Sequence, residues 1–349
     1  MNVRIASEKD REKWNQFVDR EGGSFFQYFD WKYIYEFNTS KHRFIPLVIE
    51  NTSSEILGIF PLEENLRSFY ASLSSLPFGA SDGFLIKNDL TEQEKEKIIQ
   101  SFLDYIDTNY AGSHSYIILR EHLSLSEKSH APSRVLTENG YTWENNTATG
   151  LPCTHVLKLE SPFEEKIWEG LWSKKLRKRI RHTKKTGADV IIDEKFAYID
   201  DFYAMQIETV KKFGFVERKE ILEQIIRIFR DKIQVFVCLR DKKPISVALC
   251  YYTATTAHLA MAPYHPESED YLTNTLPICA SIRYACDNGY HYYEMGFTQT
   301  AELAFHKEKF GGKQIPLMIY KKKFSRAKML TNLAFSAVKG IGRKYIEDR

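Results

Sequence analysis

A carboxylate, a histidine and a lysine stand close together near the end of the chain, and these residue types can do acid–base chemistry. Glu294 lies at the end of a strand-like run, and His306 and Lys309 lie in the segment that follows. A partly desolvated carboxylate has a raised pKa and can accept a proton near neutral pH. A histidine can supply a proton, and a lysine can neutralise an anionic ester or phosphate. We therefore take Glu294, Lys309 and His306 as the candidate catalytic residues.

Each of these residues also has a structural interpretation. Glu294 could be an alternating strand residue that faces solvent or pairs with Arg283. Lys309 could be a surface lysine, and His306 could be a helix cap or a core residue. The sequence leaves these alternatives open.

Other catalytic classes lack their motifs. No His or Cys cluster has metal-ligand spacing, and the chain contains neither a nucleophile elbow nor a Walker-type loop. The five cysteines are an odd number without paired spacing, so they form no disulfide framework. Cys238 and Cys250 lie in apolar strand patterns, and Cys279 and Cys286 lie on one predicted helix, which makes them core residues. A reducing, cytoplasmic compartment fits this pattern best.

Length and charge limit what the site belongs to. At 349 residues the chain is too long for one ordinary core, so two domains are expected. The net charge of +3 is too small to indicate nucleic-acid binding by itself. The N-terminus has no apolar run of signal-peptide length, and no stretch is apolar enough to span a membrane.

The hydrophobic periodicity predicts one order of elements twice, βααβββαβαβ, with a period of roughly 160 residues that indicates a duplicated domain and not a solenoid. The first copy has strands at 3–6, 44–50, 56–62, 68–76, 115–120 and 155–159, and helices at 8–20, 27–37, 91–109 and 133–140. The second has strands at 188–192, 233–240, 245–252, 257–262, 290–295 and 315–320, and helices at 199–213, 218–230, 275–288 and 300–310. Thr91 and Glu94 form a capping box, and Gly289 is the expected helix stop. The turn at 241–244 predicts a hairpin between the strands at 233–240 and 245–252.

A basic helix is predicted between the two copies. Trp168, Trp172, Leu176 and Ile180 recur every four residues and form one apolar stripe. The rest of its second part is basic: Lys174, Lys175, Arg177, Lys178, Arg179, Arg181, Lys184 and Lys185.

Like charges on a helix repel each other, so an anion should compensate this run. One alternative is a solvated face neutralised by Glu164, Glu165 and Glu169 or by acids of the other domain. The other is a phosphate-rich ligand such as RNA, a nucleotide or a lipid headgroup. The tail at 324–349 is a predicted basic amphipathic helix, which either packs on its own domain or contacts an anionic membrane surface.

Three segments carry a family resemblance: 24–31, 174–187, and 293–296 followed by 305–312. With the element order, they resemble the FemAB-type peptidyltransferases and the BioF2-like acetyltransferase domains. The resemblance implies an α/β (α+β) fold of two tandem GNAT-like domains, each a mixed central sheet flanked by helices. The implied parts are an N-terminal domain at 1–160, a basic linker helix at 161–187, a C-terminal domain at 188–323 and the amphipathic helix at 324–349.

The resemblance also implies a function: transfer of an acyl or aminoacyl group to an amine acceptor, with a cell-envelope precursor as a candidate. The donor would be aminoacyl-tRNA or acyl-CoA, with no tightly bound cofactor, and tRNA would bind through Lys174 to Lys185. The chain departs from the CoA-binding pattern, because the turn at 265–275 has three acids and no glycine where a pyrophosphate would bind. The alternative is therefore a non-catalytic GNAT-fold protein that binds RNA or an anionic membrane through its basic helices. Either protein would be cytoplasmic, with peripheral contact at the inner face of the membrane as an option.

Two groups of binding residues follow from the resemblance. Donor or cofactor binding is expected at Met261, Tyr264, Thr273, Asn274, Lys175, Arg177, Lys178 and Arg181. Acceptor binding is expected at Lys32, Phe78, Gly79, Asp82 and Tyr293.

Overall fold

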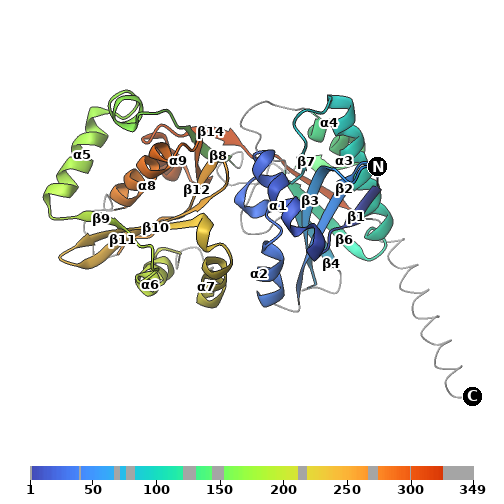
Figure 1. The fold of residues 1–349 in the computed structure, drawn as a ribbon, viewed down its shortest axis with the longest axis horizontal. Helices are drawn as coiled ribbons and strands as arrows, with labels where there is room; N and C mark the ends of the chain where they lie inside the picture. Colours follow the sequence, from blue (N-terminus) through green and yellow to red (C-terminus); the bar gives the residue numbers. More distant parts are fainter. Residues whose placement is uncertain are drawn as a thin grey trace, which may run out of the picture. The chain divides into compact units, whose positions relative to one another are not determined.

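The computed structural model describes residues 2–38, 41–66, 71–75, 83–120, 131–143, 153–210, 218–265, 274–298 and 300–324. The chain divides into two compact units. The first is Met1–Asn145 with Leu317–Arg349, and the second is Asn146–Pro316. Each contains one mixed sheet flanked by helices, as predicted (Figure 1).

The sheet of the first unit has the order β1-β2-β3-β4-β6-β15-β7, with β5 paired to β3. Its strands are β1 (Asn2–Ile5), β2 (His42–Glu50), β3 (Ile56–Asn65), β4 (Ala71–Ser75), β5 (Leu85–Ile86), β6 (His114–Arg120), β7 (Thr142–Trp143) and β15 (Ile319–Lys323). The helices are α1 (Arg11–Arg20), α2 (Trp31–Asn38), α3 (Glu92–Asn109) and α4 (Ala131–Glu138). Strands β4 and β6 run parallel, whereas the other neighbours are antiparallel.

The sheet of the second unit has the order β14-β8-β13-β12-β11-β10-β9. Its strands are β8 (Cys153–Lys158), β9 (Asp189–Ile192), β10 (Ile233–Arg240), β11 (Lys243–Tyr252), β12 (Thr256–Met261), β13 (Tyr292–Thr298) and β14 (Lys313–Pro316). The helices are α5 (Lys174–Lys185), α6 (Ile199–Val210), α7 (Lys219–Ile228), α8 (Thr275–Asp287) and α9 (Ala301–Glu308). Here β12 and β13 form the parallel pair. Helix α8 packs on β10 and β11, and α9 packs beside β13 and β8.

Local chemistry sets the element ends much as the sequence predicts. The Thr91 hydroxyl accepts from the Glu94 backbone N–H while the Glu94 carboxylate accepts from the Thr91 N–H, which completes the capping box that starts α3. Gly289 has φ +79° and ends α8, a backbone conformation that favours glycine. Strands β10 and β11 form the predicted hairpin, and Asp241 and Lys242 both have positive φ at its turn.

The last strand of each half belongs to the other half's sheet, which corrects the predicted boundaries at 160 and 323. Strand β8, from the first half, pairs with β13, whereas β15, from the end of the second, pairs with β6. The predicted single strand at 315–320 is two strands, because Pro316 has no N–H to continue the ladder and β14 ends there. Tyr320 and Phe324 are buried in the core of the first unit. The rest of the predicted helix at 324–349 lies outside the described residues.

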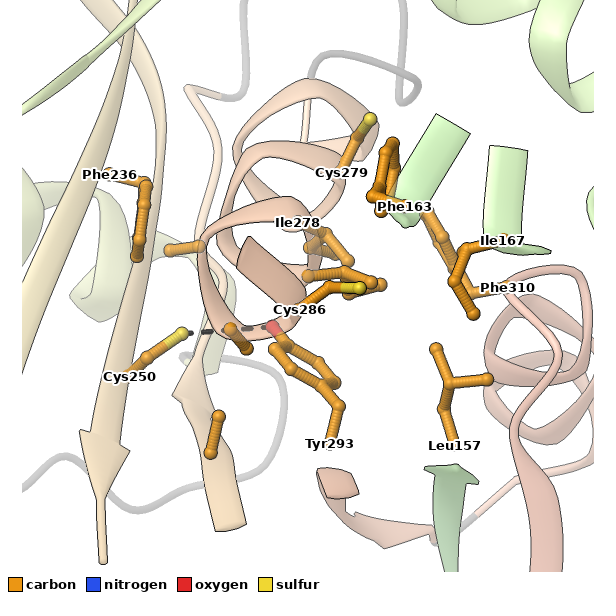
Figure 2. Packing of buried hydrophobic residues seen from close by; sticks show 14 of the residues in the cluster. Leu157, Phe163, Ile167, Phe236, Cys250, Ile278, Cys279, Cys286, Tyr293 and Phe310 are labelled. Carbon is orange, nitrogen blue, oxygen red and sulfur yellow. Dashed lines mark hydrogen bonds between the residues drawn. The ribbon is translucent and has the colours of Figure 1, made fainter. Parts of the chain in front are cut away.

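The predicted linker helix is part of the second unit. It has two pieces, a π-helical turn at Glu164–Glu169 and α5, whose first turn is capped by the Ser173 hydroxyl. Trp172, Leu176 and Ile180 of the apolar stripe are buried in the same core as the sheet and α8. Figure 2 shows this core, with α8 between the strands and the neighbouring helices. The segment therefore has a packed position and does not act as a free linker.

No helix in the described part of the chain has the length and apolar character needed to cross a bilayer.

Candidate functional site

The parallel strands β12 and β13 stop pairing at one point in the second unit. Their register ends at His258 opposite Glu294, although β12 continues to Met261 and β13 to Thr298. Among the described residues, no strand pairs with either facing edge beyond that point. Unpaired backbone N–H and C=O groups can bind an extended ligand, as the edges of sheets do.

A β-bulge marks the point where the pairing ends. Between Glu294 and Phe297 the register on β13 advances by one residue more than on β8. Gly296 lies in this bulge with φ +73°, and a Cβ there would lie 3.2 Å from the Leu259 carbonyl oxygen of β12. A glycine is needed because the backbone conformation is left-handed and β12 approaches closely.

The Glu294 carboxylate is held from several sides. The Thr154 hydroxyl of β8 donates to it, the Gly296 backbone N–H donates at 3.0 Å, and His258 Nδ1 lies 3.3 Å away. The alternative pairing with Arg283 is wrong, because Arg283 pairs with Glu164. Glu294 therefore lies in a polar cluster that strands from both ends of the second unit assemble.

The expected raised pKa of Glu294 is also wrong. Burial acts most strongly on this carboxyl and raises its pKa. The hydrogen bond from His258, the charge that this ring carries when it is protonated, the Thr154 hydroxyl and the Lys307 charge together lower the pKa below its ordinary value. The carboxylate is therefore ionised at neutral pH and is a weak proton acceptor.

His258 completes a carboxylate–imidazole pair. Its Nδ1–H donates to the ionised Glu294, which places the acceptor lone pair on Nε2. The Nε2 atom is buried and has no hydrogen-bond partner among the residues that the structure describes. A carboxylate that orients an imidazole and leaves its second nitrogen free is the arrangement of a general base.

The lysine nearest this cluster is Lys307 and not Lys309. The Lys307 ammonium donates to the carbonyl oxygens of Gly296 at 2.6 Å and Phe297 at 3.0 Å, and to the Thr298 hydroxyl at 3.0 Å. Lys309 ends α9 and places its Nζ 4.1 Å from the centre of the Phe305 ring. The difference arises because α9 turns Lys307 toward β13, with Phe310 three residues on buried in the core.

Burial brings the pKa of Lys307 close to neutral pH. It disfavours the ammonium and lowers the pKa to about 8, although the negative charge of Glu294 opposes this shift. At neutral pH the side chain is mostly protonated, and it loses its proton more easily than an exposed lysine. Such an ammonium can serve as an acid for a leaving group.

His306 and Tyr293 do not fit their expected roles. Burial and the nearby charges of Lys309 and Lys307 lower the pKa of His306 to about 4, so it carries no imidazolium proton to give at neutral pH. Tyr293 is completely buried, and its hydroxyl lies 2.6 Å from Ser281 Oγ. The same hydroxyl lies 3.6 Å from Cys250 Sγ (Figure 2). A side chain in that position cannot contact an acceptor.

The expected donor-binding residues of the second unit are only partly placed. Met261 ends β12 along the unpaired edge, whereas Tyr264 turns back to form a bridge with Ser246. Asn274 precedes α8 without capping it, and its side-chain Oδ1 is buried without a partner. Thr273 lies outside the described residues.

Helix α5 presents the predicted basic residues on its outer side, including Lys175, Lys178 and Arg181, while Arg177 is half-buried. In the part of the chain that the structure describes, no exposed lysine of α5 pairs with a carboxylate. Two of the acids that were expected to neutralise this face pair elsewhere, Glu164 with Arg283 and Glu165 with Lys166. The exposed lysines of α5 therefore keep their positive charge at the surface of the described part of the unit.

The expected acceptor residues of the first unit give little support. Lys32 pairs with Glu8 and, at 3.2 Å, with Glu36, so its charge is already neutralised. The three other residues lie outside the described ranges: Phe78, Gly79 and Asp82.

Sequence reasoning missed His258, Lys307 and Thr154. The only available signals were a histidine in an apolar strand and a lysine three residues before an apolar residue of a short helix. Neither pattern distinguishes a site residue from a core or surface residue, because the three side chains meet only after β8, β12 and α9 pack together.

Comparison with known proteins identifies the fold. A protein-family model described as an acetyltransferase (GNAT) domain matches residues 173–305, which include α5, β12, β13 and part of α9. No curated protein matches the sequence. The matched segment contains both Glu294 and His258 but ends before Lys307.

Solved structures match nearly the whole chain at low identity. A crystal structure of FemX is 13% identical, with a TM-score of 0.71 over 92% of this chain and 97% of that one. A tandem GNAT protein from the clavulanic acid biosynthesis pathway is 10% identical, with a TM-score of 0.55 over 93% and 99%. The L-PGS structure from Bacillus licheniformis is 13% identical, with a TM-score of 0.55 over 97% and 98%. These likenesses show a shared fold along the chain.

Proposed function

We propose that this chain, whose residues 173–305 belong to the acetyltransferase (GNAT) family and which has a FemAB-like tandem GNAT fold, transfers an acyl or aminoacyl group to an amine. The observation that carries the proposal is the polar cluster where the pairing of β12 and β13 ends. There a free imidazole nitrogen, a buried ammonium and two unpaired backbone edges lie together. Amide formation needs a base, an acid and backbone donors for the oxyanion, and this cluster contains all three kinds of group.

Each group has a role in the proposed reaction. His258 Nε2 accepts a proton from the attacking amine, and Glu294 holds the ring through Nδ1. Lys307 gives a proton to the leaving group and thereby releases one of its carbonyl contacts. Backbone N–H groups along Leu259–Met261 bind the developing oxyanion.

The donor that best fits the charge distribution is an aminoacyl-tRNA. The exposed lysines of α5 lack carboxylate partners within the described residues, and an RNA backbone would compensate them. The acids of the turn at 265–275 disfavour the pyrophosphate of CoA. A cell-envelope peptide precursor with a free amine is the proposed acceptor class.

Donor competition tests this proposal. The protein is incubated with an amine-bearing peptide precursor and either labelled aminoacyl-tRNA or labelled acetyl-CoA, and transfer of label to the peptide is measured. We expect label from the tRNA in the unaltered protein and none in His258→Gln. Transfer from acetyl-CoA alone would keep the transferase assignment and overturn the choice of donor.

A salt titration separates catalysis from plain binding. Neutralising Lys175 and Lys178 as glutamines should weaken tRNA binding and reduce the slope of log affinity against log salt by about 1 for each lost phosphate contact. Lys158→Gln, at an exposed lysine outside α5, is the matched control. Salt-dependent RNA binding without transfer from any donor would instead support the non-catalytic alternative.

A further inference from the structure

A line of polar contacts leads from the buried Lys307 ammonium toward the surface of the second unit. Lys307 Nζ lies 3.0 Å from Thr298 Oγ1, and Thr298 Oγ1 lies 2.9 Å from His155 Nδ1. His155 Nε2 lies 3.9 Å from a carboxylate oxygen of Glu308, whose side chain is 52% exposed. The contacts join β8 to β13 and α9, two consecutive elements that lie far from β8 in the sequence.

Only one of the three partners of Lys307 can pass a proton on. The carbonyl oxygens of Gly296 and Phe297 accept hydrogen bonds but have no proton of their own to give. The Thr298 hydroxyl can take a proton from one neighbour while it gives its own to another. Lys307 itself is 6% exposed, so water has little direct access to the ammonium.

His155 is placed to continue this transfer. The side chain is completely buried, and within the described ranges its Nε2 has no hydrogen-bond partner. A buried polar atom without a partner is uncommon and calls for a reason. Burial and the Lys307 charge lower the pKa of His155, so the ring is neutral at rest and holds an added proton only briefly.

We propose that Thr298 and His155 form a proton relay that exchanges the Lys307 proton with solvent at Glu308. The use of the relay in turnover rests on the proposed function, in which Lys307 gives a proton to the leaving group. Its existence does not depend on that function, because proton exchange can be measured without any substrate.

The transfer is balanced at each atom. When Lys307 is a neutral amine, a proton enters at Glu308 and passes to His155 Nε2, the gap of 3.9 Å being closed by side-chain motion or one water. His155 Nδ1–H then donates to Thr298 Oγ1 while the hydroxyl proton moves to Lys307 Nζ, which becomes an ammonium again. The ring therefore starts with its proton on Nδ1 and ends with it on Nε2. The reverse transfer, in which Nε2–H returns to Glu308 while Nδ1 takes the Thr298 hydroxyl proton, restores the first tautomer and completes the exchange. No bond between heavy atoms changes, and no oxidant or other reactant is required.

Other charged groups also act on Lys307 but do not form a path. Glu294 of β13 and Cys153 of β8 raise its pKa, while His306 and Lys309 lie on its own helix. Neither Glu294 nor Cys153 has a recorded hydrogen bond to Lys307 Nζ in the described residues. They set how readily the ammonium forms, whereas the relay sets how fast the proton moves.

Proton exchange at Lys307 tests the relay directly. In protein labelled with ¹⁵N-lysine, the exchange rate of the Lys307 ammonium with water is measured by NMR, and the signal is assigned with Lys307→Met. We expect Thr298→Val to slow exchange by on the order of tenfold or more, because the replacement keeps the shape and removes the hydroxyl. Thr298→Ser should restore the rate of the unaltered protein.

Thr183→Val is the matched control, because that buried hydroxyl of α5 donates to the Arg179 carbonyl and is not part of the cluster around Lys307. It should leave the Lys307 exchange rate unchanged. If Thr298→Val exchanges as fast as the unaltered protein while it remains folded, the relay is overturned. Should that variant not fold, His155→Gln provides the same readout, and unchanged exchange there overturns the relay equally.

Turnover distinguishes this proposal from the proposed function. If Thr298→Val slows proton exchange at Lys307 but leaves acyl transfer unchanged, the relay exists but does not take part in catalysis. If Thr298→Val leaves the Lys307 exchange rate unchanged while Lys307→Met abolishes acyl transfer, the proposed function stands and the relay is wrong.

Discussion

Each of the two units contains one parallel strand pair, and the two pairs end differently. In the first unit, register between β4 and β6 ends at Ser74 and Ile118, and the next residues tie the strands together. The Arg120 backbone N–H donates to Ser75 Oγ at 2.8 Å, and its guanidinium donates to the Ser75 carbonyl at 2.6 Å. In the second unit no such tie joins β12 to β13 among the described residues, and the facing edges keep unpaired backbone groups.

The carboxylate–histidine pairs differ between the units as well. In the first unit His114 binds Glu64 through Nε2, and its Nδ1 lies near Ser113 and the Tyr110 carbonyl, so both nitrogens are engaged. His42 binds Glu63 and leaves Nε2 free, but it lies on β2, two strands from the parallel pair.

Only in the second unit does a histidine with a free nitrogen, His258, lie at the end of the parallel pair. Position relative to the open strand edges, and not the presence of a Glu–His pair, therefore marks the candidate site. Four experiments test this conclusion.

The largest effect is expected from Lys307→Met, which removes the buried ammonium and keeps a side chain of similar length. Turnover should fall by on the order of 100- to 10,000-fold, because an acid in contact with the leaving group is lost. Lys309→Met on the same helix is the control and should turn over like the unaltered protein. Steady-state transfer of a labelled acyl group measures both variants, and equal losses in the two would remove Lys307 from the site.

The second test compares two histidines, His258 and His42, that each contact a carboxylate through Nδ1 and leave Nε2 without a partner among the described residues. His258→Gln should reduce turnover by on the order of 100-fold through loss of the base. His42→Gln should leave it unchanged, although the two side chains have similar exposure, 10% and 12%. Circular dichroism and thermal unfolding check that both variants fold. A comparable loss in His42→Gln would show that the first unit also takes part in the chemistry.

The third test is the pH dependence of the second unit. The pKa of Lys307 is about 8, so the ammonium is present below this pH and is lost above it. Turnover should fall about tenfold per pH unit above that value. Stability should move the other way: from about pH 8 to its ordinary value of 10.5 the unfolded chain holds a proton that the folded chain lacks, so stability rises with pH.

Urea unfolding at pH 7 and pH 9.5 measures this stability change, with Lys307→Met as the reference that should not show it. If turnover of Lys307→Met still falls above about pH 8, the titrating group is not Lys307.

The smallest effect is expected from two glycines with the same backbone conformation. Gly296→Ala and Gly140→Ala both place a Cβ at a positive φ, which costs roughly 1–2 kcal/mol. Gly140 of the first unit has open space around it, whereas at Gly296 the new carbon would lie 3.2 Å from the Leu259 carbonyl oxygen. Gly296→Ala should therefore be the more destabilising in urea unfolding and should also reduce turnover. Equal destabilisation would show that β12 and β13 are farther apart in solution.

Local elements were predictable because their causes are local. The capping box of Thr91, the stop at Gly289 and the hairpin at Asp241 depend on neighbours within a few residues, so their sequence patterns are sufficient. The partner of the last strand was not predictable, because strand pairing depends on contacts between residues far apart in the sequence, such as β15 with β6 and β8 with β13.

By itself, the sequence determined two mixed sheets, a family resemblance along the chain and a site near Glu294. The tertiary structure decided which side chains meet there. It placed Lys307 in the cluster instead of Lys309, gave Glu294 a low pKa and left His258 with a free nitrogen. The physical reason is that pKa values and hydrogen bonds depend on burial and on partners from distant segments, such as Thr154, which no local pattern records.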